Sequence, residues 1–130
     1  MELTLTTLQE ELLVSALKDR LPEIGRLSQK QVVTKIGKER FRDGAELVFS
    51  YLESSCGSSL SRNETLALLG TSLKCLANYM QSVLNIPVTM KTIWDSMHLL
   101  PYAVNLSFPG YASAGLLKAV ITPKQLPKAS

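Results

Sequence analysis

The sequence predicts an all-α protein, folded as one compact bundle of five to six helices. Apolar residues recur at steps of three and four along much of the chain, which is the spacing of one face of an α-helix. Serine and threonine residues stand before these segments, where helix N-caps are expected. No segment shows the sustained period-two alternation of a half-buried strand, so we expect no sheet.

The length of the chain fits a single domain. It has 130 residues, of which 45 % are apolar, enough to bury a core. We expect this domain to cover residues 1–121. Residues 122–130 contain two prolines and two lysines, and we expect them to form a flexible C-terminal tail.

The first predicted helix begins after Thr6 or Thr7 and runs to about Leu21, because a hydroxyl side chain can cap it and Pro22 stops it. Its expected buried side comprises Leu8, Leu12, Ala16 and Leu17. Residues 22–27 are expected to be a short connector.

Ser28 and Gln31 fit the capping-box pattern and predict the start of a second helix. Gly37 either breaks or bends this helix. Beyond it, a helical pattern resumes with the apolar residues Phe41, Ala45, Val48, Phe49 and Leu52. The small and polar residues 54–59 predict a loop.

The longest predicted helix covers about residues 62–85 and opens with a second capping box, formed by Ser61 and Glu64. Its apolar face is predicted to comprise Leu66, Leu69, Leu73, Leu76, Met80 and Val83. The opposite face is polar and nearly uncharged. Pro87 marks the end of this helix.

Two further helices are predicted near the C-terminus. Thr89 is expected to cap one of them, which ends before Pro101. Its inner side comprises Met90, Ile93, Met97 and Leu100. Ser107 and Pro109 predict the start of a last helix over about residues 109–121, which is rich in glycine and alanine.

The sequence contains no recognisable catalytic, metal or cofactor site. His98 is the only histidine; Asp95 could orient it, but a histidine near a helix C-terminus also gains from the helix dipole. One histidine and two separated cysteines cannot supply four zinc ligands without carboxylates. Cys75 is better explained as a small core residue. No glycine-rich nucleotide-binding motif is present.

Cysteine usage and the N-terminal residues predict a cytoplasmic protein. The two cysteines form neither a CxxC motif nor a disulfide framework, which favours a reducing compartment. The first residues lack the basic and apolar regions of a signal peptide. No apolar run approaches the ~20 residues of a membrane span, so no membrane partner is expected.

The distribution of charge indicates a contact with nucleic acid. Residues 26–42 contain six basic residues and one acidic residue, so this block carries +5 within a chain of net charge +3. Such a block suits contacts with a phosphate backbone, although an ordinary solvated helix face explains it equally well. The candidate nucleic-acid-binding residues are Arg26, Lys30, Lys35, Lys38, Arg40 and Arg42, with Lys74, Asn78 and Lys91 as a second group.

Three of these cations would form a stripe if the helix continued through Gly37. Lys35, Lys38 and Arg42 stand at positions i, i+3 and i+7, which share one helical face. The same region also permits a helix-turn-helix centred on Gly37. However, Lys38 and Asp43 occupy positions where that motif is expected to carry apolar residues.

Four aromatic residues lie close to Pro101 and Pro109. Aromatic residues at such a corner usually pack in the core, but they can also anchor a protein partner. The candidate protein-interface residues are Trp94, Tyr102, Phe108 and Tyr111.

Taken together, the length, the capped helices, the basic block at 26–42 and the missing catalytic signature resemble the small subunit of a Class 1 (type I) CRISPR surveillance complex. The resemblance implies a non-enzymatic subunit of an RNA-guided ribonucleoprotein complex, present in more than one copy. It would contact neighbouring subunits head to tail and hold opened target DNA by its backbone, without sequence preference. The alternatives are a helical protein–protein adaptor and a regulatory DNA-binding protein of phage or plasmid type.

Overall fold

The computed structural model describes residues 6–56 and 60–109, with the backbone alone at Ser55 and Cys56. These residues form helices and connecting turns, without a strand in the described ranges. The predicted all-α fold is therefore confirmed. The predicted tail and most of the predicted helix 109–121, including Tyr111, lie outside the described residues.

Six α-helices and three shorter or wider helical turns follow one another along the described chain. The α-helices are α1 (Thr7–Arg20), α2 (Gln29–Ile36), α3 (Lys38–Cys56), α4 (Arg62–Tyr79), α5 (Met90–Asp95) and α6 (Leu100–Ser107). The 3₁₀-helices are η1 (Pro22–Ile24) and η3 (Met97–Leu99), and η2 (Met80–Leu84) is a π-helix that extends α4.

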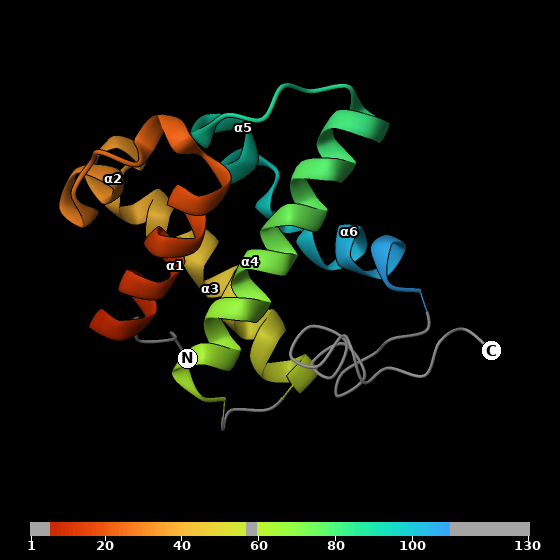
Figure 1. Cartoon of the computed structure of the whole chain (residues 1–130), viewed down its shortest axis with the longest axis horizontal. Coiled ribbons are helices and arrows are strands. Elements are labelled where there is room, and N and C mark those ends of the chain that lie inside the picture. The colour runs from red at the N-terminus through yellow and green to blue at the C-terminus, as the bar shows by residue number, and fades with distance from the viewer. Residues whose placement is uncertain (1–5, 57–59, 110–130) are drawn as a thin grey trace.

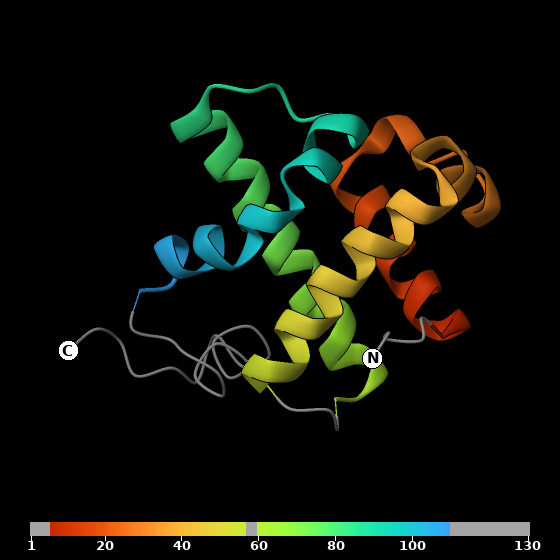
Figure 2. The same ribbon diagram turned by 180° about the vertical axis from the view of Figure 1, so that it is seen from behind.

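The helix α4 is the centre of the bundle. It packs against α1 on one side and against α6 on the other (Figure 1). The helix α3 crosses behind α4 and lies in front when the molecule is turned round (Figure 2). The helices α2 and α5 contact each other at the end where α3 begins. This end carries the candidate site.

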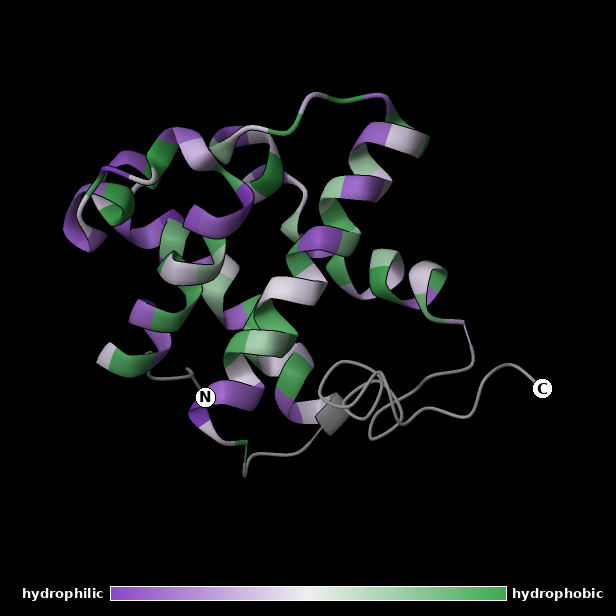
Figure 3. Cartoon of the chain, viewed as in Figure 1, coloured by the Kyte–Doolittle hydropathy of each residue, from purple (hydrophilic) through white to green (hydrophobic). Residues whose placement is uncertain are grey.

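The core is built from the apolar faces of all six α-helices. Figure 3 shows hydrophobic positions alternating with hydrophilic ones along each helix, as expected for amphipathic helices. The largest side chains that are almost fully buried are Phe41, Leu13, Leu17, Leu21, Leu52, Leu68, Leu69, Leu73, Leu76, Met80, Ile93 and Met97. All five apolar residues predicted for the buried face of α3 lie in this core.

Side-chain capping fixes where four of the helices begin. Ser28 accepts a hydrogen bond from the backbone N–H of Gln31, and the Gln31 side chain accepts one from the N–H of Ser28. The pair Ser61 and Glu64 does the same before α4. Both predicted capping boxes are confirmed, because each pair satisfies donors that the first helical turn leaves free. Reciprocal pairs that start at Thr6 and Thr89 cap α1 and α5.

Two residues predicted to be buried are exposed instead. Leu8 is 45 % exposed, because it lies in the first turn of α1, at the edge of a surface hollow. Val83 is 61 % exposed and lies in η2. The i→i+5 pattern of a π-helix shifts side chains away from the 3.6-residue repeat, so the predicted apolar face of the long helix does not extend to Val83.

Two predicted boundaries were wrong. The helix that follows Thr89 ends at Asp95, and Pro101 lies in the first turn of α6 rather than after a helix. Proline is tolerated there because the first turn lacks partners for its N–H groups anyway. The helix α3 continues to Cys56, so residues 54–56 of the predicted loop are helical. The predicted end of the long helix near residue 85 agrees with the structure, because Asn85, in the left-handed conformation, ends the π-turn before Pro87.

Gly37 separates α2 from α3 with a backbone conformation that favours glycine. Its φ is 104° and its ψ is 128°. Its N–H donates to the carbonyl of Val33, which closes α2, and its carbonyl accepts from the N–H of Phe41 in α3. A single residue thus ends one helix and begins the next, and it breaks the helix rather than bending it.

We expect Gly37→Ala to lower the free energy of unfolding by about 1–3 kcal/mol, because a β-carbon is strained at this positive φ. Urea denaturation followed by circular dichroism measures this change. Gly70→Ala provides the control, since Gly70 lies inside α4 and a β-carbon added there would meet open space. An equal stability of the two variants would contradict the role assigned to Gly37.

Gly44 lets α3 approach the ring of Trp94. A β-carbon placed on Gly44 would lie 2.6 Å from two atoms of the indole, well inside van der Waals contact. The indole cannot move easily, because its other contacts are in the core. The close approach of α3 to α5 therefore requires glycine at this position.

Gly44→Ala is expected to destabilise the protein by about 1–3 kcal/mol, because the core must shift to admit a methyl group. The same substitution at Gly70 is expected to stabilise it by about 0.5–1 kcal/mol, since alanine is the better helix former. Urea denaturation followed by the fluorescence of Trp94, the single tryptophan, measures both changes. A neutral Gly44→Ala would show that the ring is not held against the helix.

Candidate nucleic-acid interface

Trp94 holds α5 against the first turns of α3. Its ring stacks on Phe41, with a centroid distance of 5.1 Å and an interplanar angle of 11°. Its Nε1 donates a hydrogen bond of 2.7 Å to the backbone carbonyl of Arg40. Stacking and a hydrogen bond between the same two helices fix both their separation and their register.

A groove with basic side chains lies where α2, α3 and α5 meet. We call it the basic groove; it has a volume of about 300 Å³. Its lining residues are Lys35 and Ile36 from α2, Arg40 from α3, and Met90, Lys91 and Trp94 from α5. Three of the nine predicted nucleic-acid-binding residues are thus brought together, and no acidic residue lines this groove.

The break at Gly37 is what brings two of these cations to one groove. In a continuous helix, Lys35 and Arg40 would point about 140° apart, given roughly 100° per residue. Because α2 ends at Ile36 and α3 begins at Lys38, both side chains line the same hollow. Lys91 joins them from the first turn of α5. The three side chains are exposed and can reach a bound anion.

Arg40 forms an ion pair within the chain. Its Nη2 donates to Oδ1 of Asp95, at the C-terminal end of α5. The same nitrogen lies 3.4 Å from the carbonyl oxygen of Lys91. Both side chains of the ion pair are close to half exposed, 43 % for arginine and 50 % for aspartate. Arg40 was predicted to be a free phosphate contact, and in this structure an acidic neighbour holds it.

A second hollow adjoins the basic groove and contains acidic side chains. We call it the acidic hollow; it has a volume of about 250 Å³. Its lining residues are Arg40, Asp43, Gly44, Leu47, Trp94, Asp95 and His98. Arg40 and Trp94 line both hollows and so form the ridge between them. His98 is exposed, and Asp95, which was considered as its orienting partner, pairs with Arg40 instead.

The predicted stripe of Lys35, Lys38 and Arg42 is not one straight helical face, because the helix is broken at Gly37. On α3, Arg40 and Arg42 point about 160° apart around the helix axis, given roughly 100° per residue. Lys38 and Arg42 are exposed but do not line the basic groove. Of the six cations predicted in residues 26–42, only Lys35 and Arg40 therefore line the basic groove.

The remaining predicted nucleic-acid contacts also lie away from the groove. Arg26 precedes α2 and Lys30 lies in its first turn, and both are exposed. Lys74 and Asn78 are exposed on α4, where their spacing of four residues places them on one face. None of these four side chains lines the basic groove.

Of the four predicted protein-interface residues, the structure describes Trp94, Tyr102 and Phe108, which differ in exposure. Trp94 is only 5 % exposed and belongs to the core, so the core-packing interpretation holds for it. Phe108 is partly buried against the same core. Tyr102 is 54 % exposed and meets Tyr79 edge to face. Tyr111 lies outside the described residues.

The connection between α2 and α3 differs from a helix-turn-helix. That motif joins its two helices by a turn of about three to four residues. Here the only residue between the two helices is Gly37. The geometry therefore does not support the expected turn of a sequence-reading motif.

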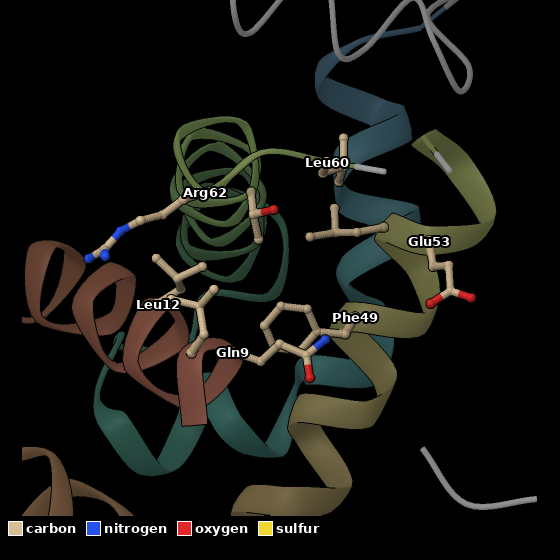
Figure 4. Close-up of a pocket in the computed structure, with 9 residues that line it drawn as sticks. Gln9, Leu12, Phe49, Glu53, Leu60 and Arg62 are labelled. Atoms are coloured by element: carbon tan, nitrogen blue, oxygen red, sulfur yellow. The ribbon is translucent and has the colours of Figure 1, made fainter. Parts of the chain in front are cut away.

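A further hollow of about 170 Å³ lies between α1, α3 and α4 and is mostly apolar. Figure 4 shows Leu12 and Phe49 directed into it, whereas the carboxylate of Glu53 points away. Arg62 reaches from α4 to Glu11 on α1, with 2.9 Å between Nη2 and Oε1. This hollow contains no cluster of reactive side chains.

The described residues contain no group of three or more His, Cys, Asp or Glu side chains that could hold a metal ion. Cys75 is a free, buried thiol, as predicted for a core residue. Within the described ranges, no helix combines the length and hydropathy needed to cross a bilayer.

Sequence reasoning identified the three cations but not their grouping. It did not predict that the apolar residues Ile36 and Met90 line the groove, or that Asp95 pairs with Arg40. Two local features of the sequence bear on this grouping. Gly37 ends α2 just after Lys35, and Thr89 caps α5 just before Lys91. Neither signal predicts that α5 folds back onto α3.

No protein-family model matches the chain, and no curated protein or solved structure matches it at a significant level.

Proposed function

We propose that this protein is a non-enzymatic subunit of a nucleoprotein complex that contacts the backbone of nucleic acid through its basic groove. The observation that carries the proposal is the convergence of Lys35, Arg40 and Lys91, which come from three different helices. A groove lined by three cations, of which only Arg40 is paired with a carboxylate, attracts a polyanion and releases the counterions condensed on it.

The contact is proposed to be with phosphates rather than with bases. Trp94 forms part of the groove, yet its ring is 5 % exposed and stacks on Phe41, so it offers no open face to a base. Ile36 and Met90 add apolar surface without a hydrogen-bonding pattern. Lys35 and Lys91 are exposed and can contact phosphate oxygens, and such contacts position a backbone without reading its sequence. Binding that is independent of sequence is expected.

The double substitution Lys35→Ala with Lys91→Ala is expected to weaken binding to all nucleic-acid sequences alike. It should reduce the slope of log K against log salt concentration by roughly 1.5, because two phosphate contacts are lost. Fluorescence anisotropy with labelled single-stranded and duplex oligonucleotides of several sequences, over a range of salt concentrations, measures both quantities.

Lys38→Ala with Arg42→Ala is the matched control, because it removes the same charge from exposed positions outside the groove. We expect this control to change binding less than the groove variant does. Equal losses would show that net charge governs binding, and an unchanged groove variant would refute the proposal. Thermal unfolding of each variant confirms that the fold is retained.

The assembly is proposed from the sequence profile and is a separate matter from the groove. We propose the small-subunit position in a type I CRISPR surveillance complex, with further copies of this chain and other protein subunits as neighbours. Three convergent cations suit the holding of opened DNA by its phosphate backbone. A role as a protein–protein adaptor would instead draw on the exposed Tyr102 and Leu106 of α6.

Purification of the tagged chain from its native host tests the assembly. Co-purification of several distinct protein subunits and of RNAs that share a repeated segment is expected. Sequencing the RNA and identifying the proteins by mass spectrometry provide the readout. Recovery of one protein partner without RNA, in an amount sensitive to Leu106→Ser, would favour the adaptor and contradict the CRISPR assembly.

A further inference from the structure

We propose that Asp95 competes with nucleic-acid phosphate for Arg40, so that an ion pair within the chain sets the affinity of the basic groove. This inference rests on the proposed function and deepens it. In the free protein Arg40 is held by Asp95. When a phosphate enters the groove, the guanidinium exchanges the carboxylate for the phosphate, and Asp95 is left facing solvent in the acidic hollow.

Because Arg40 lies on the ridge between the two hollows, its guanidinium needs to move only a small distance in this exchange. Its side chain lines both the basic groove and the acidic hollow, whereas Asp95 lines the acidic hollow alone. Lys35 and Lys91 are on the groove side of the ridge. A rotation of the arginine side chain about its own stem therefore moves the guanidinium from the carboxylate toward the two lysines, without a change in the backbone.

The energetics of the pair allow the exchange. Exposed ion pairs contribute little stability in water, and these two side chains are close to half exposed. The guanidinium fork fits phosphate as well as carboxylate and can bind either by two parallel hydrogen bonds. The backbone of Arg40 stays fixed during the exchange, because its carbonyl accepts the hydrogen bond from Trp94 Nε1.

We therefore expect Asp95→Asn to tighten the binding of single-stranded oligonucleotides about threefold, because an exposed ion pair, which contributes little free energy, no longer competes with the phosphate. The salt slope should become steeper by about 0.7, because one more phosphate contact is made without competition. Anisotropy titrations at several salt concentrations measure both effects. Asp95→Ala provides a second variant, which also removes the residual hydrogen bond that an amide could accept.

Glu11→Gln is the matched control. It raises the net charge by the same amount and breaks an ion pair of similar exposure, in which Arg62 is 58 % and Glu11 is 49 % exposed. This pair joins α1 to α4 and does not line the basic groove. Tightening by Glu11→Gln equal to that by Asp95→Asn would overturn the inference, because the gain would then come from net charge.

Arg40→Gln tests whether the tighter binding caused by Asp95→Asn depends on the arginine. In an Arg40→Gln background, Asp95→Asn should tighten binding no more than Glu11→Gln does. A full threefold gain without the guanidinium would overturn the proposed exchange, and a loss of that gain supports it. Circular dichroism and the fluorescence of Trp94 show whether each variant keeps the wild-type fold.

The outcomes separate this inference from the proposed function. If Lys35→Ala with Lys91→Ala leaves binding unchanged, the groove is not the nucleic-acid site and both proposals fail. If the lysine variant loses binding while Asp95→Asn and Asp95→Ala bind like Glu11→Gln, the groove is the site and only the competition by Asp95 is wrong.

Discussion

The packing of Trp94 on α3 is the interaction on which the candidate site depends. Its ring lies against Phe41 and Gly44 of α3, and its Nε1 donates to the carbonyl of Arg40. So short a helix as the six residues of α5 is unstable alone, and it is held by the burial of Trp94 together with Met90 and Ile93. The basic groove and the acidic hollow both lie against this indole. A change that loosens Trp94 therefore affects the stability of the core and the geometry of both hollows together.

The break at Gly37 decides how the basic block between residues 26 and 42 is presented. A continuous helix would have displayed Lys35, Lys38 and Arg42 as a stripe on one face. The break turns α3 relative to α2, so that Lys35 and Arg40 line one groove while Arg42 points to another side. A charged segment that looks uniform in sequence is thus divided into a concave cluster and scattered exposed cations. Concave clusters focus the electrostatic potential more strongly than single side chains do.

Charge at the candidate site is balanced locally by Asp95. Arg40 lines both the basic groove and the acidic hollow, and its Nη2 is bound to the carboxylate of Asp95. Under the proposed exchange, this arrangement would lower the positive charge that the free protein presents to a polyanion. It also links the two hollows, because occupancy of the groove by phosphate would release Asp95 into the hollow that Asp43 and His98 line.

Local sequence determined the helical class, four of the helix starts and most of the core, because caps and apolar spacing act over a few residues. The capping residues Ser28 and Ser61 and the buried face of α3 were predicted correctly for this reason. Three features were not predicted: the exposure of Val83, the start of α6 at Leu100 and the pairing of Arg40 with Asp95. The last of these joins residues 55 positions apart. Only the tertiary structure decided which cations converge, because convergence depends on where α5 packs on α3, and no local pattern encodes the path of the chain between them.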